Sequence, residues 1–346
     1  MFKRCLAFAT LLLGVAAAPA HAVVGGHALK PSNAPWFVTA GICGGTLIAP
    51  DRVATAVHCT DPISLADFEQ IKVGSELRRG IRVALPETWR KHRSGFAADD
   101  VAIIQLDRPV TKTKPVPILE PGESVPSKLR ILGRGQRKWN APTGATPLRQ
   151  AVLKRVGDRA CDRAFSRSRS KYRNRFEGRS EVCAIDANGR APLDSVCQGD
   201  SGGPIVGGTL KRPVLVGIIS WTGERCGADK LPTVGAEASH YREFLTAAEP
   251  VWAPVPDGPT RASQSGDTLT CAVPTWSVAP DRVDVRWTRR VRSKNGFEFK
   301  TVGRSATYTV TSRDRGQLLT CEALGSNAGG RTVTPFGVES SVRVKG

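Results

Sequence analysis

The sequence lacks any apolar run long enough to cross a bilayer, since its apolar stretch at residues 6–18 is too short for a membrane span. It has only five histidines and neither a Cys-x-x-Cys pair nor clustered histidines, so nothing indicates a zinc site. No nucleic-acid-binding signature occurs, which argues against nucleic acid as a partner. Asn-x-Ser/Thr sites (x not Pro) are also absent, which, with the Arg-rich composition, favours a bacterial exported protein.

Acidic residues are few, with 31 Asp and Glu against 50 Lys and Arg, and the net charge is +19. It stays at +17 without Lys3 and Arg4 of the first 22 residues, which contain no acids. Residues 149–179 hold eleven Arg or Lys against three acids. Such a run usually marks a solvated loop, here between Cys161 and Cys183. The alternative is attraction to an anionic surface such as a bacterial envelope, polysaccharide or extracellular nucleic acid.

A length of 346 residues suggests two or three domains. Residues 1–22 are typical of a signal peptide, with a basic start, an apolar stretch and the small-x-small site Ala20-His-Ala22. Such a segment would direct the protein to the periplasm or the medium and be cleaved after Ala22. Loss of Cys5 leaves eight cysteines, an even number that predicts a disulfide framework, although spacing alone leaves the pairing open.

The strongest chemical signal is residues 194–204, Asp-Ser-Val-Cys-Gln-Gly-Asp-Ser-Gly-Gly-Pro. Glycines around Ser201 would let a substrate backbone approach, and turn N–H groups can face a developing negative charge. A serine needs a base, usually a histidine oriented by a buried carboxylate. His58 ends an apolar stretch, and Asp100 opens the strand-like run 100–106. The alternative is a core histidine, a capping aspartate and a serine in an ordinary Gly-rich turn.

The chain from Val23 to about Ala248 resembles the trypsin/chymotrypsin family of serine proteases. The order His58, Asp100, Ser201 is the order of that family. The motifs that carry the resemblance are Val23-Val-Gly-Gly26, Thr55-Ala-Val-His-Cys59, Asp100-Val-Ala102, Gly199-Asp-Ser-Gly-Gly-Pro204 and Ser220-Trp221.

The residues predict an all-β fold, because short strands separated by Gly and Pro are expected at 36–39, 45–48, 52–56, 81–84, 101–106, 128–132, 204–206 and 214–219. The resemblance implies two antiparallel chymotrypsin-like β-barrels with the site in the cleft between them, followed by a short helix within 239–248. It also implies the disulfides Cys43–Cys59, Cys161–Cys183 and Cys197–Cys226, which leaves Cys271 for Cys321.

By this resemblance Ser201 attacks a peptide carbonyl, His58 takes its proton and Asp100 holds the imidazole. The N–H groups of Gly199 and Ser201 would form the oxyanion hole. The substrates would be proteins or peptides, cleaved through an acyl-enzyme. No metal or organic cofactor is implied.

The resemblance further implies that the free ammonium of Val23 pairs with Asp200 and shapes the oxyanion hole. Relatives usually mask this amine with a propeptide, whereas no residue separates the predicted cleavage site from Val23. We therefore expect signal peptidase itself to produce the active form. The alternative is cleavage a few residues earlier, which would leave a short pro-segment.

The specificity pocket implied by the resemblance has Ser195 at its floor, followed by Val196, with Thr222 and Thr233 as walls. Trypsin-like members have aspartate at the floor and open-pocketed members have glycine at both walls. Two threonines narrow the slot, so we expect elastase-like cleavage after small aliphatic residues. The alternative is trypsin-like cleavage after Arg or Lys, if a bulge lets Asp194 enter the pocket.

The tail is expected to be a separate domain. Residues 250–262 form a Pro-rich, extended linker. The Cys271, Trp287, Cys321 order in residues 263–346 resembles an immunoglobulin-like β-sandwich, although Leu319 replaces the usual tyrosine two residues before the second cysteine. Because such a module can bind a partner, the remaining alternative for the whole chain is a secreted binding or adhesion protein on a protease scaffold.

Overall fold

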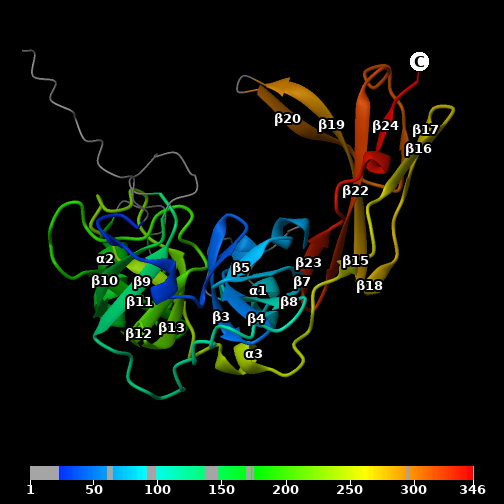
Figure 1. Ribbon diagram of the computed structural model, residues 1–346. Helices are drawn as coiled ribbons and strands as arrows, with labels where there is room; N and C mark the ends of the chain where they lie inside the picture. Colours follow the sequence, from blue (N-terminus) through cyan, green and yellow to red (C-terminus); the bar gives the residue numbers. More distant parts are fainter. Residues whose placement is uncertain are drawn as a thin grey trace, which may run out of the picture.

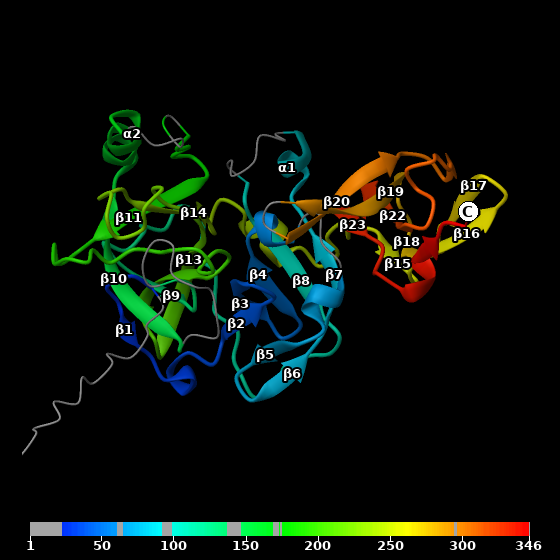
Figure 2. The same ribbon diagram turned by 90° about the horizontal axis from the view of Figure 1, so that it is seen from above.

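The computed structural model describes residues 23–60, 65–91, 99–136, 147–168, 173, 175–293 and 296–345 (Figure 1). The predicted signal peptide, and residues 169–172 and 174 of the basic segment, lie outside these ranges. Among the described residues, no helix has the length and apolar character of a bilayer span. Two barrel-like sheets and the tail lie in a row, with the first barrel between the second barrel and the tail (Figures 1 and 2).

The first barrel is a seven-stranded antiparallel sheet in the order β6-β5-β2-β3-β4-β8-β7. Alternation places apolar side chains inside: Ile71 and Val73 are buried, whereas Lys72 between them is exposed. The strands are β2 (Phe37–Ala40), β3 (Cys43–Ala49), β4 (Arg52–Thr55), β5 (Ile71–Val73), β6 (Glu76–Arg78), β7 (Gly80–Ala84) and β8 (Ala102–Leu106).

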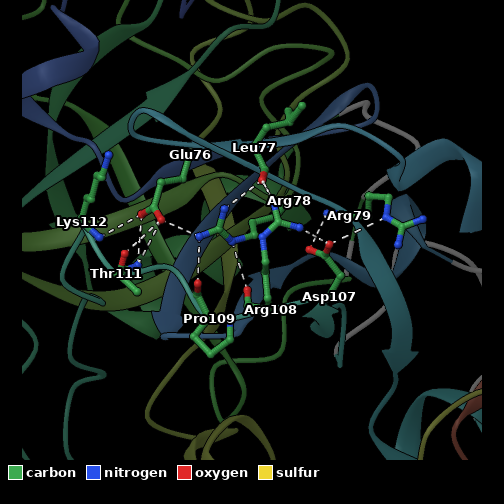
Figure 3. A network of polar contacts seen from close by, with 9 residues as sticks. All are labelled: Glu76, Leu77, Arg78, Arg79, Asp107, Arg108, Pro109, Thr111 and Lys112. Carbon is green, nitrogen blue, oxygen red and sulfur yellow. Dashed lines mark hydrogen bonds and ion pairs between the residues drawn. The ribbon is translucent and has the colours of Figure 1, made fainter.

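A polar network ties β6 to the segment that leaves β8 (Figure 3). The buried guanidinium of Arg78 donates to the carbonyl oxygens of Arg108 at 3.1 Å and Pro109 at 2.8 Å, and pairs with Glu76. Glu76 in turn accepts the backbone N–H groups of Thr111 and Lys112. This network joins β6 to residues 108–112 by polar contacts.

The second barrel has the strand order β1-β10-β11-β14-β13-β12-β9, and pairing of β9 with β10 closes it. Its strands are β1 (His27–Ala28), β9 (Lys128–Gly133), β10 (Arg149–Val156), β11 (Glu181–Asp186), β12 (Pro204–Thr209), β13 (Arg212–Trp221) and β14 (Thr233–Glu237). The α-helices of the described ranges are short: α1 (Glu87–Lys91), α2 (Asp158–Ser166) and α3 (Arg242–Thr246). The structure therefore confirms the all-β, chymotrypsin-like two-barrel fold and its short terminal helix.

The basic segment differs from its expected form. The prediction of a solvated loop between Cys161 and Cys183 is wrong for the first residues after Cys161, because they belong to α2, which extends to Ser166. Cys161 and Phe165 lie one turn apart and are both fully buried, while the charged residues face outward. Basic residues here cover one face of a helix that packs on the barrel.

The tail forms further β-sheets. One sheet has the order β20-β19-β22-β23, with β24 also on β22; the others are β16-β17-β21 and β15-β18. Trp287 is 0 % exposed and packs in one core with the Cys271–Cys321 disulfide and Leu319. The strands are β15 (Val255–Pro256), β16 (Arg261–Ser265), β17 (Thr268–Ala272), β18 (Trp276–Val278), β19 (Arg282–Ser293), β20 (Gly296–Gly303), β21 (Thr307–Thr309), β22 (Leu318–Asn327), β23 (Gly330–Val333) and β24 (Ser341–Arg343).

The segment predicted as a linker lies against the first barrel. Trp252 is buried and forms a β-bridge with Ala84 at the end of β7, and Ala253 N–H donates to Val83 O at 2.7 Å. The tail adds a second contact, because Leu85 N–H donates to Gly329 O at 2.9 Å. The tail is thus attached to the barrel by backbone hydrogen bonds as well as by the chain.

Candidate active site

His58 and Asp100 of the first barrel are held in direct contact. His58 lies in the short 3₁₀ helix Val57–Cys59 after β4, and the Cys43–Cys59 disulfide fixes the end of that helix. His58 Nδ1 lies 2.7 Å from Asp100 Oδ2, and His58 backbone N–H donates to Oδ1 at 3.0 Å. Because both carboxylate oxygens contact the same residue, the imidazole is held in one orientation.

Burial and pairing act in opposite directions on these two groups. Burial raises the pKa of Asp100, which is 1 % exposed, but the charge and hydrogen bonds of His58 outweigh it and leave the pKa below its usual value. Burial lowers the pKa of His58, but the charge and hydrogen bond of Asp100 outweigh it and leave that pKa raised. The arrangement combines an ionised carboxylate with an imidazole that is a stronger base than a free histidine.

The second barrel also holds Asp100, and Tyr241, directly before α3, holds the neighbouring Asp99. Ser220 Oγ, at the end of β13, donates to Asp100 Oδ2. The neighbouring Asp99 has a left-handed φ of 68° and donates its N–H to Tyr241 Oη at 2.7 Å. Tyr241 Oη–H donates back to Asp99 Oδ1 at 2.7 Å. Asp100 therefore lies where both barrels fix its position.

Ser201 lies on a glycine-rich turn at the junction of the barrels. Gly44 N–H, in β3, donates to Ser201 O at 2.7 Å, and Gly202 N–H donates to Ile219 O at 2.8 Å. Gly202 has φ of 75°, and a Cβ there would lie 2.2 Å from Thr55 Oγ1 and 2.5 Å from Gly44 O. Only glycine allows this approach, which brings the serine turn to the end of β4, just before His58.

The turn expected to form the oxyanion hole contains a glycine in the left-handed region. Gly199 has φ of 91°, and a Cβ there would lie 2.9 Å from Gly135 Cα. Within the described ranges, neither Gly199 N–H nor Ser201 N–H donates to a protein acceptor. Backbone donors of this kind can receive an oxyanion.

Asp200 lies behind the serine turn and is 0 % exposed. Its carboxylate accepts the N–H groups of Gly135 at 2.8 Å and Cys197 at 2.9 Å, yet burial raises its pKa to about 7. No cation pairs with Asp200 among the described residues. Val23 is buried in one apolar cluster with Val196, but its nitrogen is still a peptide nitrogen because residues 1–22 precede it.

The four residues of the expected specificity pocket lie on connected segments. Ser195 is 5 % exposed and donates from Oγ to Val196 O at 3.0 Å, while Thr233 Oγ1 accepts Val196 N–H at 3.5 Å. Thr222 Oγ1 donates to Pro232 O at 3.0 Å. The Cys197–Cys226 disulfide joins these segments. Two threonine side chains thus stand at positions where glycine would leave space.

Asp194 points toward the N-terminal segment. Its Oδ2 accepts Asn188 Nδ2–H at 3.0 Å, and its Oδ1 lies against Gly25, where a Cβ would be 2.4 Å away. Burial, together with the charge of Asp186, raises the pKa of Asp194. One oxygen of this carboxylate therefore already accepts a hydrogen bond from the protein.

Several residues around the site were not identified from the sequence. Ser220 was found only as part of a motif, and Tyr241 gave no signal because its partner Asp99 is distant in the chain. Glu181 is buried behind Trp221 and accepts its Nε1–H at 2.9 Å; burial raises the pKa of Glu181 to about 7. The side chains of Cys43, His58 and Cys59 cluster as the ligands of a metal ion would. Both sulfurs are in a disulfide, however, and supply no thiolate.

Comparison with known proteins agrees with this geometry. The family model described as Trypsin matches residues 23–245. A trypsin-like protease of Streptomyces glaucescens is 30 % identical over 259 residues, covering 71 % of this chain and 92 % of the relative. Trypsin delta and trypsin iota of Drosophila melanogaster are 27 % and 28 % identical, covering 64 % and 65 % of this chain and 87 % and 88 % of the relatives. The chain belongs to the trypsin family and is a serine endopeptidase.

Proposed function

We propose that the protein is an exported serine endopeptidase in which Ser201, His58 and Asp100 form the catalytic triad. Ser201 Oγ attacks the substrate carbonyl carbon while His58 Nε2 takes its proton, and Asp100 stabilises the imidazolium. The N–H groups of Gly199 and Ser201 receive the oxyanion. His58 then gives the proton to the leaving amine, and water hydrolyses the acyl-enzyme by the same route.

The observation that carries this proposal is the His58–Asp100 contact of 2.7 Å, with Ser220 as a second donor to Asp100. This contact selects the tautomer with Nδ1 protonated, so Nε2 carries the lone pair that accepts a proton. Covalent labelling by a fluorophosphonate tests the proposal, with Ser201→Ala as the matched control. A binding protein on a protease scaffold would not react, and equal labelling of both proteins would contradict the role of Ser201.

We propose cleavage after small aliphatic residues. The pocket base would be Ser195, and the walls Thr222 and Thr233 would exclude a long side chain. The hydrogen bond from Asn188 to Asp194 supports this reading over the trypsin-like alternative. Chromogenic peptides ending in Ala, Val, Phe and Arg separate the two: preference for Ala or Val is expected, and preference for Arg would reverse the assignment.

Export and activation are proposed as one step. Signal peptidase cleavage after Ala22 would free the Val23 ammonium, which would pair with Asp200. Four disulfides are consistent with an oxidising compartment, periplasm or medium. Mass-spectrometric sequencing of the secreted N-terminus is the test; any start other than Val23 would contradict the single-step activation.

The tail is proposed to be an immunoglobulin-like domain at residues 263–346, following a protease domain at 23–249 and a linker at 250–262. Support comes from Trp287, which packs on the Cys271–Cys321 disulfide. Attraction of residues 149–179 to an anionic surface or polysaccharide remains a further proposal, with nucleic acid disfavoured. Binding of the Ser201→Ala protein to anionic polysaccharide, before and after Arg159→Glu/Arg163→Glu in α2, tests it; unchanged binding would contradict it.

A further inference from the structure

The hairpin of β19 and β20 extends beyond its own sheet. β19 pairs with β22 only from Arg282 to Arg289, but continues to pair with β20 as far as Ser293. Its outer part is therefore a two-stranded ribbon, which reaches from the tail back over the first barrel (Figures 1 and 2). A two-stranded ribbon is marginally stable in water by itself.

One face of this ribbon carries two arginines and two phenylalanines. Arg290 lies opposite Phe299 and Arg292 opposite Phe297, and residues opposite each other or two apart share a face. Phe297 is 58 % and Phe299 71 % exposed, and the Arg290 guanidinium lies 3.7 Å from the centroid of the Phe297 ring. We call these four residues the Arg/Phe face.

The charge of the Arg/Phe face is not balanced within the described residues. The arginines nearer the sheet have acidic partners: Arg286 pairs with Glu322 and Arg289 with Asp314. Arg290 and Arg292 have no carboxylate partner in the described ranges. Glu298 lies between the two phenylalanines in sequence and so points to the opposite face. A ligand that complements this face would be anionic and would also offer apolar surface.

β20 also ends its sheet, with β19 as its one neighbour in the described structure. An edge strand presents backbone N–H and C=O groups that an extended peptide can pair with. A lipid bilayer cannot satisfy those groups, and burying them in hydrocarbon is costly. The edge therefore favours a polypeptide over a membrane as the partner.

We propose that the Arg/Phe face and the outer edge of β20 form an exosite for an extended protein segment that carries both acidic and apolar side chains. The segment would add to β20 as a strand, with carboxylates on Arg290 and Arg292 and apolar side chains on Phe297 and Phe299. That the segment belongs to a substrate rests on the proposed endopeptidase function. Capture on the same chain would raise the local concentration of scissile bonds at Ser201.

The test uses the full secreted chain with Ser201→Ala. Its ligand is a fluorescent peptide with the repeat Glu-Thr-Leu-Thr, which places Glu and Leu in turn on one face of an extended strand. We expect fluorescence anisotropy to show saturable binding. The affinity should fall by at least about tenfold in the double variant Arg290→Glu/Arg292→Glu, and by as much in the double variant Phe297→Ser/Phe299→Ser. Lys300→Glu, on the opposite face of the same ribbon, is the matched control and should leave binding within about twofold. An unchanged thermal-unfolding profile confirms that each variant is folded.

Two further readouts make the outcomes distinct. A peptide N-methylated at alternate residues loses backbone donors and should bind at least about tenfold more weakly; equal binding would overturn addition to the β20 edge. Binding to phosphatidylglycerol vesicles without peptide binding would overturn the polypeptide partner. The same variants with Ser201 restored should hydrolyse a short chromogenic peptide at the native rate. If no form hydrolyses it, the proposed function fails while the binding result still decides the exosite.

Discussion

Asp100 and Asp200 are both buried where the barrels meet, but their surroundings differ. Asp100 accepts two hydrogen bonds from His58 and one from Ser220, and its pKa lies below the usual value. Among the described residues, Asp200 accepts only the backbone N–H groups of Gly135 and Cys197, and burial raises its pKa to about 7. Two peptide N–H groups do not offset the rise in pKa that burial causes at Asp200, whereas an imidazole and a hydroxyl do offset it at Asp100.

The site has two halves, one around Asp100 with His58 and one around Asp200 with the serine turn. The difference between the two aspartates indicates which half is already assembled in the full chain. The Asp100 half already has its partners, His58 in the first barrel and Ser220 in the second. The Asp200 half is a buried acid with no cation in the described residues, and a free Val23 ammonium would supply one. We therefore interpret the first half as preformed and the second as completed by cleavage.

The largest expected effect comes from breaking the complete half. Asp100→Asn in the Val23 form should lower kcat about 10⁴-fold, because an amide favours the wrong imidazole tautomer. The acid limb of the kcat/KM profile should also move to lower pH, since Asp100 raises the pKa of His58. Steady-state kinetics from pH 5 to 9 measure both. A loss below about tenfold would contradict the role given to Asp100.

The lack of a cation beside Asp200 should make the free energy of unfolding of the uncleaved chain depend on pH. Burial raises the pKa of Asp200 to about 7, so the folded uncleaved chain binds a proton that the unfolded chain releases near pH 4. The stabilising effect is complete below pH 4 and is lost as pH rises toward 7, by at most about 4 kcal/mol. Urea unfolding of the uncleaved Ser201→Ala chain at pH 4 to 8 measures it.

The matched control for that experiment is the Val23 form. An ammonium beside Asp200 favours the ionised carboxylate, so its loss of stability across the same range should be smaller. Glu181, whose pKa burial also raises to about 7, contributes to both forms alike. Identical pH profiles for the two forms would contradict pairing of Val23 with Asp200.

Asp200→Asn sharpens the comparison because it should lower the activity of the Val23 form but raise the stability of the uncleaved form. It should lower kcat of the Val23 form about 10²-fold, the order seen when one oxyanion donor is lost. It should stabilise the uncleaved form above pH 7, because a neutral amide costs less to bury than a carboxylate. Denaturant midpoints and kinetics on both forms provide the data, and destabilisation of the uncleaved form would refute the charge argument.

The smallest expected effect is that of Ser220→Ala. Removing one hydroxyl donor from a carboxylate that keeps two bonds to His58 should lower kcat about tenfold. Thr46→Ala, a buried hydroxyl of the first barrel away from this network, is the control for loss of a hydroxyl alone. Equal effects of the two substitutions would show that the Ser220 bond has no specific role.

The sequence predicted the fold where short-range patterns are strong. All eight expected strands overlap observed strands, because alternation and Gly or Pro boundaries mark them. β1, β5, β6, β10, β11 and β14 of the two barrels were not predicted; in β10, charged residues such as Lys154 and Arg155 stand among the apolar ones. Trp252 lies in a Pro-rich segment, and nothing local indicated that it would bridge to Ala84.

For the site, the motifs located His58, Asp100 and Ser201, and the structure brings His58 and Asp100 into contact and the serine turn to the end of β4. The contacts of Ser220 and Tyr241 join residues more than a hundred positions apart. Such pairs follow from packing of the two barrels and leave no spacing to read. The direction of Asp194, toward Asn188 and Gly25, likewise depends on tertiary contacts.

The most direct test of the account compares fluorophosphonate labelling of the form that starts at Val23 with that of a form that keeps Ala22. A single added residue leaves the triad untouched but removes the ammonium from its place at Asp200. We expect rapid labelling at Ser201 in the Val23 form and labelling at least about 10²-fold slower in the extended form. Equal labelling rates would contradict completion of the site by cleavage.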